Sequence, residues 1–128
     1  VDGESVAQSL ARVHGALREV FGGALDVTLL GMGPDGHIAS LFPGHPALVD
    51  APREALALHV ADAPKPPPSR ITLTHSLLAT ASTHIMLAVG EGKRDALERV
   101  IDLDRTLPAV GLHGLVIVTD VNLRERGI

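Results

Sequence analysis

The chain has no cysteine, tryptophan or tyrosine, and phenylalanine occurs only at Phe21 and Phe42. The lack of cysteine excludes disulfides and thiolate chemistry, and it fits a cytoplasmic location. With so few aromatic residues, stacking on a sugar ring cannot be a main means of recognition. No apolar run is long enough to span a membrane, so we expect no membrane contact. The formal net charge of −4, without a basic face, argues against a nucleic-acid partner.

Histidine is frequent, with seven residues in the chain. None of them shows the HxxxH or HExxH spacing that is typical of metal ligands on a helix. We therefore expect no metal site. The composition, with 45% hydrophobic and 20% charged residues, is sufficient for one core, and we treat residues 1–128 as a single domain.

Periodicity predicts a succession of helices and strands. Apolar residues recur every three or four positions from Val6 to Phe21, after a capping box at Ser5 and Gln8 and before Gly22. Further helices are expected at about 37–42, 76–81 and 92–103, and strands at about 25–30, 55–60, 70–74, 85–89 and 115–119. Four prolines between residues 64 and 68 form a stiff, non-helical connector. Strands that alternate with helices predict a three-layer α/β fold with a mostly parallel sheet.

The most informative segment is the loop that follows the first strand, GMGPDGHIASLFPG at residues 31–44. In open parallel sheets, ligands bind at the carboxyl ends of strands, where glycine allows a close approach of the backbone. The loop adds a carboxylate and a histidine, and a histidine can transfer protons near neutral pH. These features predict an active-site loop that contains Gly31, Gly33, Asp35, Gly36 and His37.

The same loop matches the dinucleotide fingerprint GxGxxG at Gly31, Gly33 and Gly36. That fingerprint requires a long helix after the loop, and Pro43 to Pro46 would end such a helix early. Asp35 would also place a negative charge where the pyrophosphate has to bind. A nicotinamide cofactor is therefore not expected.

Individual residues allow two readings each. His37 is either a surface histidine at the start of a short helix or a general base, because a helix N-terminus favours the neutral imidazole. Asp35 is either a turn-forming residue or the carboxylate that orients His37, and the two roles are compatible. Lys93, at a helix start, is either a solvated lysine or a phosphate ligand. Arg70, at a strand start, is by default a surface residue.

Four ordered blocks resemble the signature of 6-phosphogluconolactonases, a family related to glucosamine-6-phosphate deaminases. They are residues 30–46, 67–74, 90–93 and 107–109, and the resemblance extends from about Val13 to Asp120. The resemblance implies a Rossmann-like fold and hydrolysis of a phosphorylated sugar lactone, with no cofactor. It also implies that His37 is the base and that Lys93 and Arg70 bind the substrate phosphate.

Phe42 separates the two branches of this superfamily. Deaminases carry Asn-Glu before the Pro-Gly of this loop, and the glutamate transfers protons during ring opening, whereas Leu41-Phe42 stands here. We therefore expect hydrolysis of 6-phospho-D-glucono-1,5-lactone in the oxidative pentose phosphate pathway. The alternatives are a deaminase or isomerase, and a sugar-phosphate-binding module or inactive remnant.

The resemblance also indicates what is missing. Members of the family are longer, with a glycine-rich phosphate loop and an acid–arginine motif in their N-terminal part, and neither occurs in this sequence. We expect the chain to be the C-terminal portion of such a domain or a mis-started gene product, and to be weakly active or inactive alone. Its sheet should keep an unpaired edge or an uncovered apolar face, which favours a homo-oligomer or an N-terminal complement.

Overall fold

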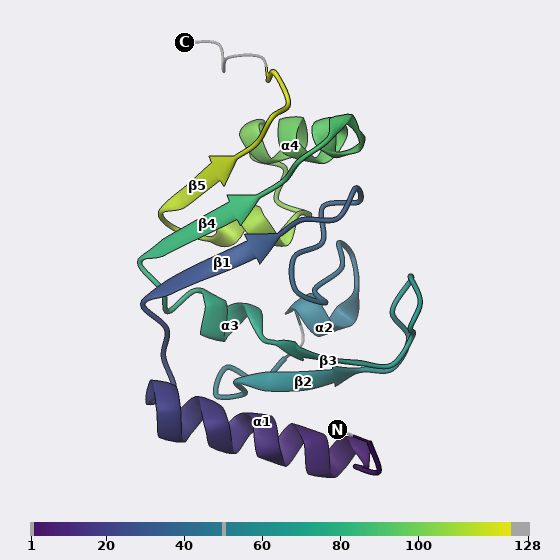
Figure 1. Ribbon diagram of the computed structural model, residues 1–128, viewed down its shortest axis with the longest axis vertical. Helices are drawn as coiled ribbons and strands as arrows, with labels where there is room; N and C mark the ends of the chain where they lie inside the picture. The colour runs from purple at the N-terminus through teal and green to yellow at the C-terminus, as the bar shows by residue number, and fades with distance from the viewer. Residues whose placement is uncertain (1, 50, 124–128) are drawn as a thin grey trace.

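The computed structural model describes residues 2–49 and 51–123 of the chain. Figure 1 shows a parallel sheet in the middle, helix α4 toward the C-terminal end and helix α1 at the opposite end, below a hairpin. In chain order the elements are α1 (Val6–Phe21), β1 (Val27–Gly31), α2 (Pro46–Val49), β2 (Ala57–Val60), β3 (Arg70–Leu73), α3 (His75–Leu78), β4 (Thr83–Leu87), η1 (Glu91–Lys93), α4 (Arg94–Ile101), η2 (Pro108–Gly111) and β5 (Leu115–Val118).

Helix α1 begins and ends where the sequence predicts. The Ser5 side chain accepts a hydrogen bond from the Gln8 backbone N–H, and the Gln8 side chain accepts one from the Ser5 N–H. This capping box satisfies two N–H groups that a helix start leaves unpaired. Gly22 ends the helix in the left-handed conformation, with φ of 66°. Leu17 is buried on the inner side of α1 and packs with Ala57 of β2 and Leu77 of α3.

The main sheet has the strand order β1-β4-β5, and both pairings are parallel. The mostly parallel α/β sheet expected from the sequence is therefore confirmed, with boundaries shifted by a few residues. Strand β4 lies in the centre and, in the described residues, β1 and β5 each pair on one side only. The carboxyl ends of β1 and β4 consequently lie next to each other, since Gly31 is paired with Leu87.

One face of this sheet carries the core. Leu30 of β1 and Met86 of β4 are buried there against the apolar side of α4, which presents Ala96, Leu97 and Val100. Thr28 and His84 lie on the same face and are also buried. This alternation of buried and exposed residues follows from the twofold period of a strand.

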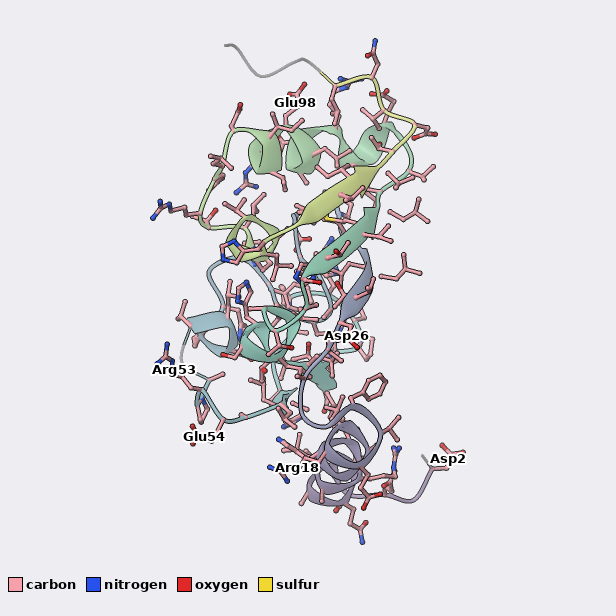
Figure 2. All side chains as sticks on the ribbon, turned by 90° about the vertical axis from the view of Figure 1, so that its left-hand side faces the viewer. Asp2, Arg18, Asp26, Arg53, Glu54 and Glu98 are labelled. Atoms are coloured by element: carbon pink, nitrogen blue, oxygen red, sulfur yellow. The ribbon has the colours of Figure 1, made fainter. Side chains whose placement is uncertain are left out.

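The opposite face of the sheet is apolar and exposed. Its exposed residues are Val27, Leu29, Leu87, Val116 and Val118, and the register places Leu29, Ile85 and Val116 side by side across the three strands. In Figure 2, side chains of the sheet project to the right of the strands, where no described helix covers them. All-parallel sheets are normally covered on both faces. The uncovered apolar face expected from the sequence is therefore present, and we call these residues the open sheet face.

Strands β2 and β3 form a separate antiparallel pair. The proline-rich segment that joins them is not helical, as predicted, and the Pro66–Pro67 peptide bond is cis. Its ends are closed by a hydrogen bond from the Ala63 N–H to the Pro68 carbonyl, at 2.9 Å. The connector is thus an ordered loop that projects from the hairpin.

The prediction of a helix at residues 37–42 is wrong. These residues form a tight turn in which the Leu41 N–H donates to the Ile38 carbonyl at 2.9 Å, and Ala39 adopts a positive φ of 49° that no α-helix contains. The turn buries Ile38, Leu41 and Phe42 almost completely. Burial of these three apolar side chains favours the turn over a helix that would expose part of them. His37 therefore does not lie at a helix N-terminus.

Candidate active site

The candidate site lies at the edge of the sheet where β1 and β4 end. The loop of residues 32–45 follows β1, and the Gly90–Lys93 turn follows β4. Because the two strands are adjacent and parallel, their following loops converge at the same edge. This is the edge at which ligands bind in open parallel sheets.

An open pocket of about 550 Å³ lies between these loops. Four of the residues that line it were predicted from the sequence as site residues: Gly31, Gly33, His37 and Lys93. The others are Met32, Pro34, Ala39 and Lys65. Loops far apart in the sequence therefore bring a histidine and two cationic side chains to one cavity.

Asp35 and His37 form a close pair beside this pocket. The ring Nδ1 of His37 lies 2.6 Å from Oδ1 of Asp35, and the same oxygen accepts the backbone N–H of His37 at 3.2 Å. A carboxylate at Nδ1 selects the tautomer that carries the proton there, which leaves Nε2 as the basic nitrogen. Both roles considered for Asp35, the turn and the orienting carboxylate, thus occur in the same geometry.

The charge state of Asp35 agrees with this arrangement. Burial alone would raise the pKa of Asp35, but the hydrogen bonds from the ring and backbone of His37, the charge of His37 and the positive charge of Lys65 lower it below its ordinary value. The carboxylate is therefore ionised at neutral pH. An ionised Asp35 can stabilise an imidazolium that forms at His37.

Gly33 and Gly36 shape this loop. A side-chain carbon on Gly33 would overlap the His37 ring, and the Gly33 N–H donates to the His37 carbonyl at 2.9 Å. Gly36 has φ of 92° and packs against Leu107, so a larger residue there would be strained and would clash. The two glycines therefore allow the loop to fold back on His37.

Phe42 supports the ring of His37 from the core. Its ring centroid lies 4.6 Å from that of His37, and the Arg70 guanidinium carbon lies 5.3 Å from it. Phe42 is almost fully buried. Phe42 is thus a packed aromatic ring that cannot transfer a proton, at the position that distinguishes lactonases from deaminases in the family that the sequence resembles.

Lys93 reaches the pocket from the other loop. It lies at the junction of η1 and α4, and its Nζ donates to the carbonyl of Met32 in the loop after β1. Lys93 therefore connects the two loops directly. The geometry agrees with the predicted position at a helix start, while the phosphate contact itself stays a prediction.

Arg70 is placed differently from the expectation. Its guanidinium donates to the carbonyls of Lys65 and Pro66 at 3.0 Å and to that of Pro67 at 2.9 Å. It is not among the residues that line the pocket. Its predicted contact with phosphate stays a prediction, and here the guanidinium holds the proline-rich connector.

Lys65 is the charged pocket residue that the sequence analysis missed. It lies in the connector between β2 and β3, and a lone lysine among prolines gives no signal of a site. The one available signal was its position shortly before the block at residues 67–74. Only the folded connector brings Lys65 to the pocket that His37 lines.

No group of three or more metal-binding side chains occurs in the described part of the chain. A second hollow of about 410 Å³, lined by Leu103, Arg105, Val110 and Gly111, contains no histidine or carboxylate. Two further hollows are lined by a histidine, His14 in one and His75 in the other, but neither lining contains a carboxylate. Among these hollows, the one with an aspartate–histidine pair is therefore the first pocket. None of the described helices is long and apolar enough to cross a membrane.

Comparison with known proteins agrees with this site. The chain is 45% identical over 111 residues to the 6-phosphogluconolactonase of Rattus norvegicus, which covers 83% of this chain and 41% of the relative. It is 44% identical over 103 residues to that of Homo sapiens, which covers 77% of this chain and 38% of the relative. The chain thus spans about two fifths of the length of these relatives.

Solved structures show the same fold. The 6-phosphogluconolactonase of Thermotoga maritima superposes with a TM-score of 0.76 at 26% identity, over 91% of this chain and 53% of that one. A monomeric glucosamine-6-phosphate deaminase has a TM-score of 0.68 at 15% identity, over 92% of this chain and 54% of that one. The family model of glucosamine-6-phosphate isomerases and 6-phosphogluconolactonases matches residues 1–118. The chain therefore belongs to the glucosamine-6-phosphate isomerase/6-phosphogluconolactonase family.

Proposed function

We propose that this chain contributes the acid–base half of a site that hydrolyses 6-phospho-D-glucono-1,5-lactone to 6-phosphogluconate, in the oxidative pentose phosphate pathway. The observation that carries the proposal is the Asp35–His37 pair in a pocket that Lys93 also lines. A lactone is an electrophilic ester, so its hydrolysis needs only an activated water and stabilisation of negative charge. The names of the similar relatives support the substrate.

In the proposed reaction, Nε2 of His37 takes a proton from a water molecule as the water oxygen attacks the lactone carbonyl carbon. Asp35 accepts the Nδ1–H and stabilises the resulting imidazolium. The tetrahedral intermediate then breaks its bond to the ring oxygen, and the imidazolium donates its proton to that oxygen. The acid product ionises at neutral pH, and no cofactor takes part.

For the substrate phosphate, we assign Lys93 as the direct ligand, because an ammonium with the neighbouring helix N-terminus suits an anion. Gly31, Gly33 and Gly36 allow the substrate to approach the backbone closely. Arg70 supports binding indirectly, because its guanidinium holds the connector that carries Lys65. A direct contact between Arg70 and phosphate would require the guanidinium to release one of its carbonyl partners.

A deaminase or isomerase is less favoured than a lactonase, because the aromatic ring of Phe42 occupies the position where a proton-transferring glutamate would be needed. A sugar-phosphate-binding module without turnover is the second alternative.

We propose a cytoplasmic location, because a chain without cysteine fits a reducing compartment. Location varies in this family, since rice relatives are named as chloroplastic.

Replacement of His37 by Ala tests the proposal. Loss of a general base typically lowers the rate by about 10²–10⁴-fold, so hydrolysis above the spontaneous background should nearly disappear. Affinity for 6-phosphogluconate, measured by calorimetry, should change little. His59→Ala is the matched control, because His59 pairs with Ser69 outside the pocket. An unchanged rate in His37→Ala would exclude His37 as the base. Binding without any hydrolysis, even when the N-terminal part of a relative is supplied in trans, would favour the binding module.

A further inference from the structure

The turn of residues 38–41, which follows His37 directly, has a strained backbone. The Leu41 N–H donates to the Ile38 carbonyl at 2.9 Å, and of the two residues between them only Ala39 has a positive φ, of 49°. This combination is typical of a type II′ turn, in which that position is normally occupied by glycine. Ala39 also lines the pocket. An alanine in this conformation persists only where the surrounding structure holds it.

Thr72 of strand β3 holds the other central residue of this turn. Its Oγ1 accepts the Ser40 backbone N–H at 3.0 Å and donates to the Leu73 carbonyl at 3.0 Å. Because the hydroxyl proton is directed at Leu73, a lone pair is available for Ser40. Thr72 is only 4% exposed. One buried hydroxyl group therefore attaches the turn to a strand 32 residues further along the chain.

The same turn connects Thr72 with the candidate base. His37 lies immediately before the turn and Phe42 immediately after it, and their ring centroids are 4.6 Å apart. Arg70, on the strand that also carries Thr72, places its guanidinium carbon 5.3 Å from the centre of the Phe42 ring. A change of the backbone at Ala39 would therefore move His37 relative to Phe42.

From this geometry, and resting on the proposed lactonase function, we infer that Thr72 is a positioning residue for His37. Its hydroxyl offsets the strain at Ala39, and the strained turn keeps the His37 ring against Phe42. Thr72 is not among the residues that line the pocket, so it neither binds substrate nor transfers a proton. It acts on the reaction only through the position of the His37 imidazole.

Thr72 and Thr74 give a matched pair of variants. Thr74 is also fully buried, and its Oγ1 donates to the Ala55 carbonyl at 2.7 Å and accepts the Leu77 N–H at 3.1 Å. Thr72→Val and Thr74→Val therefore each remove a buried hydroxyl that both donates and accepts, while they keep the shape of the side chain. Both variants should melt at a lower temperature than the unmodified chain. Only Thr72→Val should affect His37.

Proton NMR of the His37 ring measures the effect without substrate. The ring current of Phe42 shifts the ring protons of His37, and Phe42→Leu gives their shifts without that ring. Thr72→Val should move the His37 ring protons toward the Phe42→Leu values. Thr74→Val should leave them at the values of the unmodified chain, and so should Thr72→Ser, which retains the hydroxyl.

Relief of the strain provides a rescue experiment. Glycine adopts a positive φ without strain, so the turn with Ala39→Gly should need the Thr72 hydroxyl less. In the Thr72→Val background, Ala39→Gly should therefore return the His37 ring protons most of the way to their unmodified shifts.

Hydrolysis gives a second measurement, made at a temperature at which each variant is folded. Since a displacement of about 1 Å can lower a catalysed rate by about 10²-fold, Thr72→Val should lower kcat by about 10–100-fold. KM should change little, because Thr72 does not bind the substrate. Thr72→Ser and Thr74→Val should keep kcat within a few-fold of the unmodified value.

The unmodified chain provides a test that does not depend on the folding of a variant. Hydrogen exchange of the Ser40 amide should be slow, because its N–H is bonded to a buried hydroxyl. Fast exchange at Ser40 would overturn the inference. So would unchanged His37 shifts in Thr72→Val, equal shifts in the two valine variants, or no rescue by Ala39→Gly.

The proposed function fails separately. If the His37 shifts respond as expected but the chain hydrolyses no lactone, even with the N-terminal part of a relative supplied in trans, only the lactonase proposal is contradicted.

Discussion

Gly33 has no side-chain carbon, and this absence allows the ring of His37 to lie close to the backbone of the loop. A side-chain carbon there would overlap Nδ1 and Cε1 of His37, so Gly33→Ala should displace the ring from Asp35. A displacement of about 1 Å can lower a catalysed rate by about 10²-fold. We expect a loss of that size in lactone hydrolysis, and changed NMR chemical shifts of the His37 ring.

Gly15→Ala provides the matched control, because an added carbon at Gly15 would meet nothing within 4 Å. Gly15 lies inside helix α1, where alanine stabilises by about 0.5–1 kcal/mol relative to glycine. This variant should therefore melt at a higher temperature and hydrolyse the lactone at the unmodified rate. Equal activity of both variants would show that Gly33 does not position His37.

Lys93 should affect affinity rather than turnover. If it binds the phosphate in both the ground and the transition state, Lys93→Ala should raise KM for the phosphorylated lactone by about 10–100-fold and leave kcat within a few-fold. Steady-state kinetics with unphosphorylated gluconolactone should change little. Equal damage with both substrates would contradict the assignment of Lys93 to the phosphate.

At the scale of secondary structure, strands β1 and β4 are joined by a buried polar pair as well as by their backbone. Oγ1 of Thr28 lies 2.5 Å from Nδ1 of His84, and His84 is fully buried. Burial lowers the pKa of His84, the nearby Ala81 carbonyl opposes this, and the charges of His75 and His113 lower it further. The core of the sheet therefore contains a histidine that is neutral when folded.

This pair makes the sheet sensitive to acid. Since the unfolded chain binds a proton at His84 near pH 6.5 and the folded chain only at lower pH, its contribution to stability is complete above about pH 6.5. It declines as the pH falls from there toward the folded pKa. Urea unfolding between pH 7.5 and 5 should show this loss.

His84→Gln removes the titrating group and should flatten this pH dependence, although it lowers stability at every pH. His59→Gln is the control, because His59 lies outside the core and pairs with Ser69, and it should keep the slope of the unmodified chain. If His84→Gln and the unmodified chain lost stability in parallel, the acid sensitivity would have to arise from other histidines.

At the scale of the whole molecule, the open sheet face is the feature with the largest expected effect in solution. Leu29 is 76% exposed and Val116 is 49% exposed, and both flank Ile85 in the strand register. Contiguous apolar surface of this kind favours association. We therefore predict that the chain self-associates and that Leu29→Thr with Val116→Thr reduces this association, measured by sedimentation velocity at several concentrations.

Threonine is well tolerated in strands, so the double variant should keep the circular dichroism of the unmodified chain. Val49→Thr is the control, because Val49 is 77% exposed but lies in α2, away from the sheet. It should not change the sedimentation. A strictly monomeric unmodified chain would contradict the prediction.

The active-site loop illustrates how far the sequence could go. Gly33, Asp35 and His37 are near neighbours in the chain, so their mutual contacts follow from local turn chemistry, and their position after a strand was correctly predicted. The local helix expected at 37–42 was wrong, because burial of Ile38, Leu41 and Phe42 depends on the core that surrounds them. Propensity and periodicity contain no information about that core.

The sequence by itself determined most of the helices and strands, the mostly parallel sheet and the loop that carries Asp35 and His37, because short-range periodicity, caps and glycines act within a few residues. Only the tertiary structure decided that Arg70 holds the connector while Lys65 enters the pocket, and which face of the sheet stays uncovered. Those outcomes depend on contacts between segments that are distant in the chain. Such contacts are set by packing and strand register, which no single segment specifies.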